Sequence, residues 1–165
     1  MKRSVQKFVV GAALRLVHAA LAELREMDPY VASEMASLPQ GMSYAIHTGH
    51  GAPSLYVQWD GKKLRRCRAG AVEPLCELHL KALSISFRLF TGQMGLAQAY
   101  AQHAFTMSGE VADVMRLARL VNHAECYLFP AFITRRFLSE QPRLARSPLW
   151  FYLRLSFGLL TRKYA

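Results

Sequence analysis

The residues that could form a metal or nucleophile site are six histidines and three cysteines. Only His47 and His50 lie close together in the sequence, and no Asp, Glu or Cys cluster at matching spacing accompanies them. Protein metal sites recruit three or more such ligands. The sequence therefore predicts no metal site.

A nucleophile site has one candidate location. Cys126 follows Glu125, and His123 lies three residues earlier, so that Cys126 and His123 share a helical face. A lone Cys in an apolar helix is more commonly a buried small side chain than a reactive thiolate. The chain also contains no G-x-S-x-G, Walker-type or G-x-G-x-x-G segment. We expect no enzymatic activity and no cofactor, with an enzyme that acts on acyl substrates as an alternative of a different class.

The three cysteines, Cys67, Cys76 and Cys126, are widely spaced and form no C-x-x-C pair. This pattern favours reduced thiols and a cytoplasmic protein.

Length, composition and charge limit the class of protein and the kinds of molecule that it can bind. The 165 residues suit one domain, and 52% are hydrophobic while 19% are charged, which excludes an intrinsically disordered chain. With 21 Lys and Arg against 11 Asp and Glu, the net charge is +10. An apolar, basic protein of this kind contacts either lipid or nucleic acid.

The N-terminal segment resembles a signal peptide, because basic residues precede an apolar run over 8–22. Arg15 and His18 interrupt this run, which is shorter than the roughly 18 residues that a membrane span needs. The spacing of its apolar residues predicts an amphipathic helix that the mature protein retains.

The rest of the chain alternates between strand and helix patterns. Asp28 and Pro29 suit the N-cap and first position of a short helix. Strands are predicted over 43–48, 54–59, 62–68, 75–81 and 103–108, and helices over 82–90, 96–102 and 110–124. This order predicts an α+β fold, with a sheet on one side and helices on the other.

Three short motifs in this region carry a family resemblance. They are Thr91-Gly92-Gln93-Met94, Gln98-Ala99-Tyr100 and Phe105-Thr106-Met107-Ser108-Gly109-Glu110. Together with the order of elements over 43–122, they resemble the sterol carrier protein type 2 domain. His103 stands where that family has Gly, Tyr100 replaces Phe, and Glu110 replaces Asp or Asn.

Elementary stereochemistry gives these positions a role. Gly92 and Gly109 can adopt the left-handed conformation that ends a helix or turns a strand sharply. We expect Glu110 to cap the following helix or to interact favourably with its dipole. The resemblance divides the chain into an N-terminal helical extension (1–40), a lipid-binding domain (41–130) and a basic aromatic tail (131–165).

The resemblance implies a five-stranded, mainly antiparallel sheet covered by helices, with extra helices at both ends. An apolar tunnel between the layers would bind a fatty acyl chain, sterol, phospholipid or isoprenoid and present or transfer it without catalysis. An alternative is an accessory protein that holds a ubiquinone-type precursor for a biosynthetic complex. The residues expected to line the tunnel are Phe87, Phe90, Met94, Leu96, Tyr100, Phe105, Met107, Met115, Leu120 and Tyr127.

The tail has seven basic residues and one acid over 134–165, around an aromatic run at 149–153. One interpretation places this helix in a membrane interface, and the other packs it on the core. The residues expected to contact membrane or headgroups are Arg143, Arg146, Trp150, Phe151, Arg154, Arg162 and Lys163. Anionic lipid would then attract a cytoplasmic protein to the inner membrane.

The nucleic-acid alternative rests on the basic strand over 62–68, near Tyr56 and Trp59. The sequence lacks the aromatic signature of an RNA-recognition sheet, and its tail is far more apolar than phosphate binding needs. No nucleic-acid partner is therefore expected.

Overall fold

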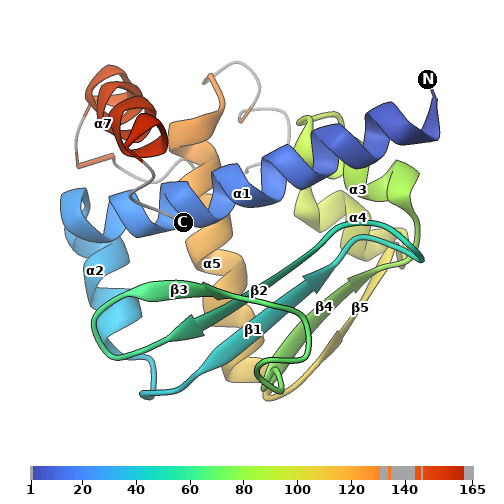
Figure 1. Ribbon diagram of the computed structural model, residues 1–165, viewed down its shortest axis with the longest axis horizontal. Coiled ribbons are helices and arrows are strands. Elements are labelled where there is room, and N and C mark those ends of the chain that lie inside the picture. Colours follow the sequence, from blue (N-terminus) through green and yellow to red (C-terminus); the bar gives the residue numbers. More distant parts are fainter. Residues whose placement is uncertain (1, 131–133, 135–143, 146, 162–165) are drawn as a thin grey trace.

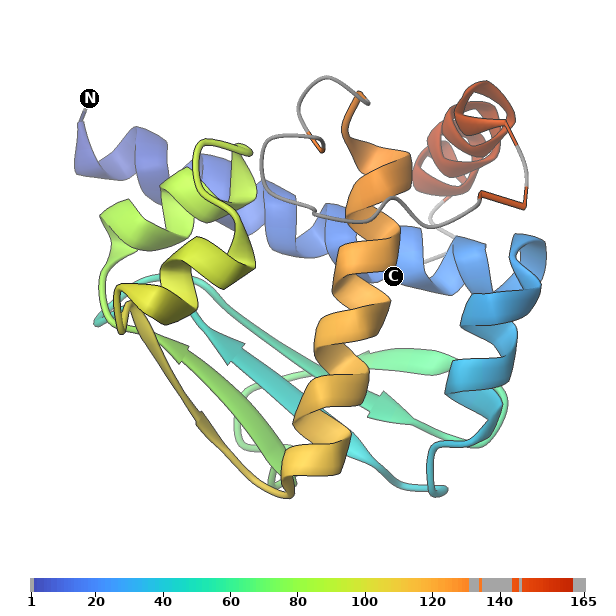
Figure 2. The same cartoon turned by 180° about the vertical axis from the view of Figure 1, so that it is seen from behind.

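A mixed five-stranded sheet carries the helices on one of its faces (Figures 1 and 2). The computed structural model describes residues 2–130, 134, 144–145 and 147–161. The strand order is β3-β2-β1-β4-β5, and the β1–β4 pair is parallel while the other pairs are antiparallel. The predicted α+β class and the mainly antiparallel sheet are thus confirmed.

The strands are β1 (Ser43–His47), β2 (Ser54–Trp59), β3 (Leu64–Cys67), β4 (Cys76–Leu80) and β5 (Phe105–Ser108). The helices are α1 (Arg3–Met27), α2 (Pro29–Ala36), α3 (Leu83–Phe90), α4 (Leu96–Ala101), α5 (Val111–Leu128) and α7 (Pro148–Leu160).

The pleat of β2 follows the predicted alternation. Leu55, Val57 and Trp59 are buried under the helices, whereas Tyr56 and Gln58 are half-buried on the other face. Because each strand turns alternate side chains to the helices, the sheet has an apolar inner face and a polar outer face.

Helix α1 spans the helical layer and contacts β2, β3, α3, α5 and α7. Ten of its residues are buried, including Val10, Leu14 and Leu24. By length and composition α1 could cross a membrane, which corrects the expectation that the segment is too short. A long core helix passes the same test, and the contacts of α1 are those of a core helix.

The junction between α1 and α2 forms as predicted. The Asp28 carboxylate accepts hydrogen bonds from the backbone N–H groups of Tyr30 and Val31, at 2.9 and 3.4 Å, and Pro29 begins the helix. These bonds satisfy two N–H groups that the first turn of a helix leaves without intrahelical partners.

Glycines turn the chain on either side of α4 and β5. Gly92 has φ 69° and Gly109 has φ 107°, as expected, and a Cβ atom at Gly109 would lie 2.8 Å from the Cys76 sulfur. His103 adopts φ 48°, a conformation that glycine reaches without strain. Glu110 occupies the N-cap position of α5, but its side chain makes no capping hydrogen bond, so the predicted capping bond was wrong; the predicted interaction with the helix dipole stays a prediction. Asp113 adds a negative charge in the first turn.

Candidate functional site

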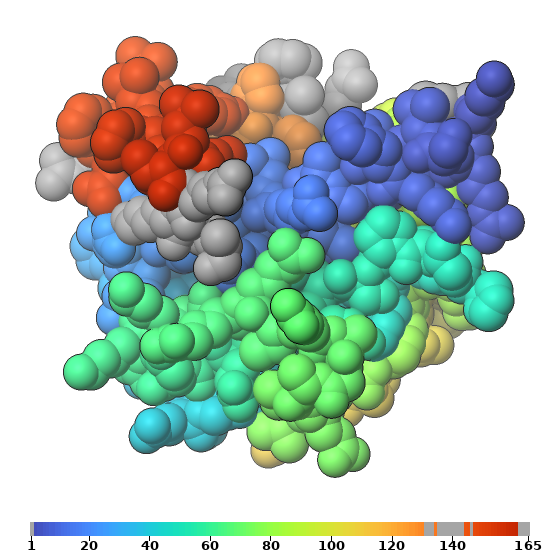
Figure 3. Space-filling model, viewed as in Figure 1, coloured from blue at the N-terminus to red at the C-terminus, as the bar shows by residue number. Residues whose placement is uncertain are grey.

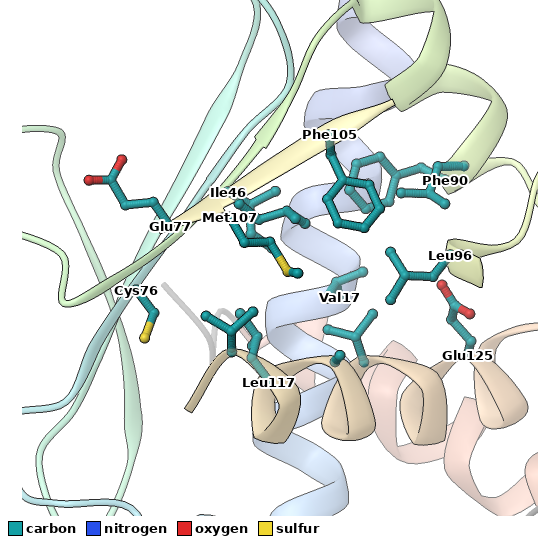
Figure 4. Close-up of a pocket in the computed structure, with 15 residues that line it drawn as sticks. Val17, Ile46, Cys76, Glu77, Phe90, Leu96, Phe105, Met107, Leu117 and Glu125 are labelled. Carbon is teal, nitrogen blue, oxygen red and sulfur yellow. The ribbon is translucent and has the colours of Figure 1, made fainter. Parts of the chain in front are cut away.

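An apolar cavity lies between the inner face of the sheet and α5 (Figure 4). Its floor comes from three neighbouring strands, where Ile46 pairs with Leu78 and Leu78 pairs with Met107 in the strand register. These side chains form a row because residues in register on adjacent strands point to the same face.

Helix α5 forms the facing wall with residues at helical spacing. They are Val114, Leu117, Ala118, Val121 and Glu125. Intervals of three and four residues place these side chains on one stripe of the helix. Phe90, Leu96 and Phe105 complete the lining on the side of α3 and α4.

A second apolar cavity adjoins the first. Four side chains, Val17, Ile46, Leu117 and Val121, line both. The cavities measure about 50 and 20 Å³, so each is far smaller than the roughly 300–1,000 Å³ of typical ligand pockets. Because the two cavities share four side chains, we expect rotation of those side chains to join the cavities into one longer channel.

Two acidic residues, Glu77 and Glu125, belong to this lining, and Glu125 comes from the α5 wall (Figure 4). Among the described residues the Glu125 carboxyl group makes no hydrogen bond or ion pair. Burial among apolar side chains raises the pKa of Glu125 to about 7, because the charged form loses its hydration there. Near neutral pH a large fraction of the group is therefore an uncharged carboxylic acid that can donate a hydrogen bond.

A separate polar cluster lies where α1, α2 and α5 meet. The second carboxylate oxygen of Asp28 is 2.8 Å from both His123 Nε2 and the Tyr127 hydroxyl, and all three side chains are buried. Burial alone would raise the pKa of Asp28, but hydrogen bonds from His123, Tyr127 and the Tyr30 N–H lower it. The Tyr127 hydroxyl also accepts a bond from the Ala145 N–H at 3.0 Å.

The residues expected to line a tunnel are distributed over several environments. Phe90, Leu96, Phe105 and Met107 line the first cavity. Leu120 lines the second.

The others lie elsewhere. Met94 is buried in the core, and Phe87 packs against that core. Tyr127 belongs to the Asp28 cluster, while Tyr100 and Met115 are 65% and 48% exposed and lie outside both cavities. Physically, Met115 follows Val114 in α5 and so is turned about 100° away from the cavity.

Sequence reasoning missed Val17, Val121 and Glu125. The spacing of 114, 117, 118, 121 and 125 could have identified the α5 stripe, and it differs from the stripe that includes Met115. Nothing local in the sequence shows that Val17, from a distant helix, meets this stripe.

The tail helix α7 packs one face on the core. Phe151 is fully buried against Tyr127, with ring centroids 5.2 Å apart, so the expectation that it contacts membrane was wrong. Arg154 pairs with Glu23 and Glu26 of α1, and Trp150 is 53% exposed. Arg143, Arg146, Arg162 and Lys163 lie outside the described residues.

The outer face of the sheet holds a further group of polar side chains. His47, Glu77 and His79 bring their ligand atoms within 4.8 Å of one another, which the expectation of no metal-ligand cluster did not foresee. The reason is that β1 and β4 are adjacent in space but separated by 28 residues of sequence between them.

The sequence matches no described protein family and no curated protein. Similar solved structures include one described as "UbiJ-SCP2 Ubiquinone synthesis protein", with 15% identity and a TM-score of 0.46 over 62% of this chain and 89% of that one. Another is a sterol carrier protein domain 2 from Helicoverpa armigera, with 18% identity and a TM-score of 0.43 over 63% and 81%.

A third is a conserved hypothetical protein, possibly a sterol carrier protein, from Thermus thermophilus. It has 13% identity and a TM-score of 0.44 over 77% of this chain and 89% of that chain. The likeness to sterol carrier domains expected from the sequence thus recurs among solved structures.

Proposed function

We propose that this protein binds the apolar chain of a lipid between its sheet and α5, without catalysing a reaction. The observation that supports this most directly is the pair of adjoining apolar cavities, which share Val17, Ile46, Leu117 and Val121 as walls. Apolar cavities of this kind stay dry and accept apolar guests.

Binding requires the lining to open, because the cavities together are too small for a long chain. Each methylene transferred from water contributes about 0.8 kcal/mol, so about ten methylenes contribute about 8 kcal/mol towards moving the walls. Met107, on the edge strand β5, is 41% exposed and flexible, and it is the natural point of entry.

Glu125 narrows the class of lipid. A protonated carboxyl group in an apolar wall donates a hydrogen bond to a neutral oxygen, as in an alcohol, ester or quinone. A phosphate or carboxylate beside Glu125 would instead be repelled whenever Glu125 is ionised. We therefore propose a lipid whose buried polar group is uncharged.

One face of the molecule carries features suited to a membrane surface. Figure 3 shows α7 and the N-terminal half of α1 on one face. The exposed side of α7 is apolar: Leu149, Trp150, Leu153, Phe157 and Leu160 are between 53% and 84% exposed. An exposed apolar helix side with Trp at its boundary suits the interface of a bilayer.

Basic residues accompany this face. Lys7, Arg15 and Arg66 line a groove between α1 and β2, with no acidic residue in its lining and with Phe8 77% exposed beside it. Each cation near an anionic leaflet contributes about 1 kcal/mol to binding. We propose a cytoplasmic protein that meets the inner membrane through α7 and this groove.

A channel-blocking variant tests the lipid proposal. Leu117→Trp fills the wall shared by both cavities, and Met115→Trp places the same side chain on the exposed side of α5. Loss of space for about two methylenes corresponds to about tenfold weaker binding. The measurement is titration with a pyrene-labelled long-chain alcohol, together with mass spectrometry of lipids extracted from the purified chain.

Tenfold weaker binding in Leu117→Trp, with wild-type binding in Met115→Trp, supports the channel. Equal binding in all three proteins, or no lipid bound by the wild type, contradicts it. Salt-sensitive binding to oligonucleotides would then favour the nucleic-acid alternative.

The membrane proposal is tested separately. The double variant Phe157→Ser, Leu160→Ser removes apolar area from α7, and Leu75→Ser removes an exposed apolar side chain from the loop before β4. We expect the α7 double variant to float less than the wild type with vesicles of phosphatidylglycerol and phosphatidylcholine, and Leu75→Ser to float like the wild type. Unchanged flotation of the α7 variant would exclude α7 as the membrane contact.

The second candidate is an accessory protein that holds a ubiquinone-type precursor for a biosynthetic complex. Glu125 favours it specifically, because a phenol or quinone ring carries neutral oxygens that accept or donate a hydrogen bond. Preferential extraction of a polyprenyl phenol or quinone, rather than of acyl lipids, would distinguish the two.

A further inference from the structure

Two histidines and one glutamate meet on the outer face of the sheet. The parallel β1–β4 register pairs His47 with His79 and Ala45 with Glu77. Because Ala45 is small, the Glu77 side chain has room to extend along the strands towards both imidazoles. Glu77 is among the residues that line the first cavity, but Figure 4 shows its carboxylate pointing away from that cavity, so the carboxylate and the two imidazoles lie on the opposite side of the sheet.

The three side chains converge on one point. His47 Nε2 and His79 Nε2 lie 3.0 and 2.8 Å from the same oxygen of Glu77. The two imidazole rings are stacked, with centroids 4.3 Å apart and an interplanar angle of 7°. Both rings therefore present the same nitrogen to one place beside a carboxylate.

These distances are close to those that a small metal ion needs. Ligand atoms about 2.0–2.1 Å from a tetrahedral zinc ion are about 3.3 Å from one another. Small rotations of Glu77 and the two rings would widen the present spacing to this value. The side chains are between 25% and 46% exposed, so an ion can reach them from solvent.

A neighbouring hydroxyl can serve as acceptor for the tautomer that ligation needs. The Ser54 hydroxyl lies 3.5 Å from His47 Nδ1, where it can accept a hydrogen bond from a protonated Nδ1. A proton on Nδ1 leaves the lone pair of Nε2 available for a metal. Tyr56 packs edge-on against the same ring, at 5.5 Å between centroids, and limits its rotation.

We propose that His47, Glu77 and His79 form a binding site for a divalent first-row transition metal ion, with Zn²⁺ as the natural occupant. Two nitrogen ligands and one oxygen ligand suit Zn²⁺, Ni²⁺ or Cu²⁺, whereas Mg²⁺ and Ca²⁺ prefer oxygen ligands alone. Three protein ligands leave at least one position for water or for a donor atom of another molecule.

The test uses the untagged full chain, freed of metal with a chelator. Zn²⁺ alone is titrated in by calorimetry, with Mg²⁺ as the comparison ion, and Co²⁺ is added separately to record visible absorption. We expect one Zn²⁺ per chain, no measurable Mg²⁺ binding, and the Co²⁺ bands of a site with fewer than six ligands.

Single variants identify the ligands. His79→Ala and Glu77→Gln should each weaken Zn²⁺ binding by at least the roughly 10- to 100-fold that loss of an outer-shell partner costs. His50→Ala is the matched control, because His50 is an exposed loop histidine outside the cluster. It should bind Zn²⁺ like the wild type.

The proposal is overturned if the wild type binds no Zn²⁺, or if His79→Ala and Glu77→Gln bind it as tightly as the wild type. Thermal unfolding without metal shows whether each variant is folded. Should Glu77→Gln be unstable, Glu77→Asp provides a second variant, which shortens the ligand and must also weaken binding. Lipid binding is measured on the same variants and should not change, because the cluster faces away from the cavity.

Discussion

Two carboxyl groups, the buried one of Asp28 and the half-buried one of Glu125 on α5, show how hydrogen-bond partners decide what such a group does. Asp28 accepts hydrogen bonds from His123, from Tyr127 and from the start of α2, and its pKa falls. Glu125 makes no hydrogen bond or ion pair among the described residues, and burial raises its pKa to about 7. A fully bonded carboxylate ties elements together, whereas one left without bonds is available to a ligand.

The largest expected effect comes from removing the bonded group. Asp28→Ala deletes the cap of α2 and leaves His123 and Tyr127 without their buried acceptor. We expect the free energy of unfolding to fall by about 3–5 kcal/mol, measured by urea denaturation. Glu34→Ala, which breaks an exposed ion pair with Arg119, should cost about 1 kcal/mol or less. Similar losses in both variants would contradict the structural role of Asp28.

The second prediction concerns Glu125 and pH. Its pKa in the folded state lies above the ordinary value of 4.5, so the folded protein holds this proton more tightly than the unfolded chain. Stability is therefore greatest below about pH 4.5 on this account and falls as pH rises towards and through 7, by up to about 3 kcal/mol.

Glu125→Gln should remove this dependence. The unfolding free energy of the variant should exceed that of the wild type only slightly near pH 5 and by much more near pH 8, in denaturation series at several pH values. Asp28 does not contribute to this range, because its lowered pKa affects stability only at more acidic pH. Parallel pH profiles for the variant and the wild type would show that Glu125 is paired or hydrated.

The smallest expected effect comes from a variant that removes one part of the Asp28 cluster. Tyr127→Phe removes one hydroxyl that donates to Asp28 and accepts from the Ala145 N–H, while the ring still packs on Phe151. We expect a loss of about 1–2 kcal/mol in urea denaturation. A loss as large as that of Asp28→Ala would mean that the Tyr127 hydroxyl, rather than the Asp28 carboxylate as the shared acceptor, provides most of the stability of the cluster.

Local features were the predictable ones. The Asp28–Pro29 helix start, the left-handed Gly92 and Gly109, and the alternation of β2 each depend on a few consecutive residues. Glu110 failed as a cap because residue type alone does not fix the direction of its side chain. The class of the fold followed from the order of these local patterns.

The site was predicted less well because it depends on distant pairings. The sequence predicted that α5 is a helix, but it did not show which side of this helix faces the sheet. Phe151 was misplaced because α7 is apolar on nearly every side, which leaves no polar face to orient it. The His47, Glu77 and His79 cluster exists only through the parallel β1–β4 register.

The ion pair between Glu23 of α1 and Arg154 of α7 has a consequence for synthesis of the chain. The two residues are 131 positions apart, and translation at about 5–20 residues per second separates them by roughly 7 to 26 seconds. For the later part of that interval the apolar stripe of α1 is outside the ribosome while one of its packing partners, α7, has not yet been made. We expect the incomplete chain to expose the part of α1 that α7 later covers, and exposed apolar surface of this kind favours aggregation.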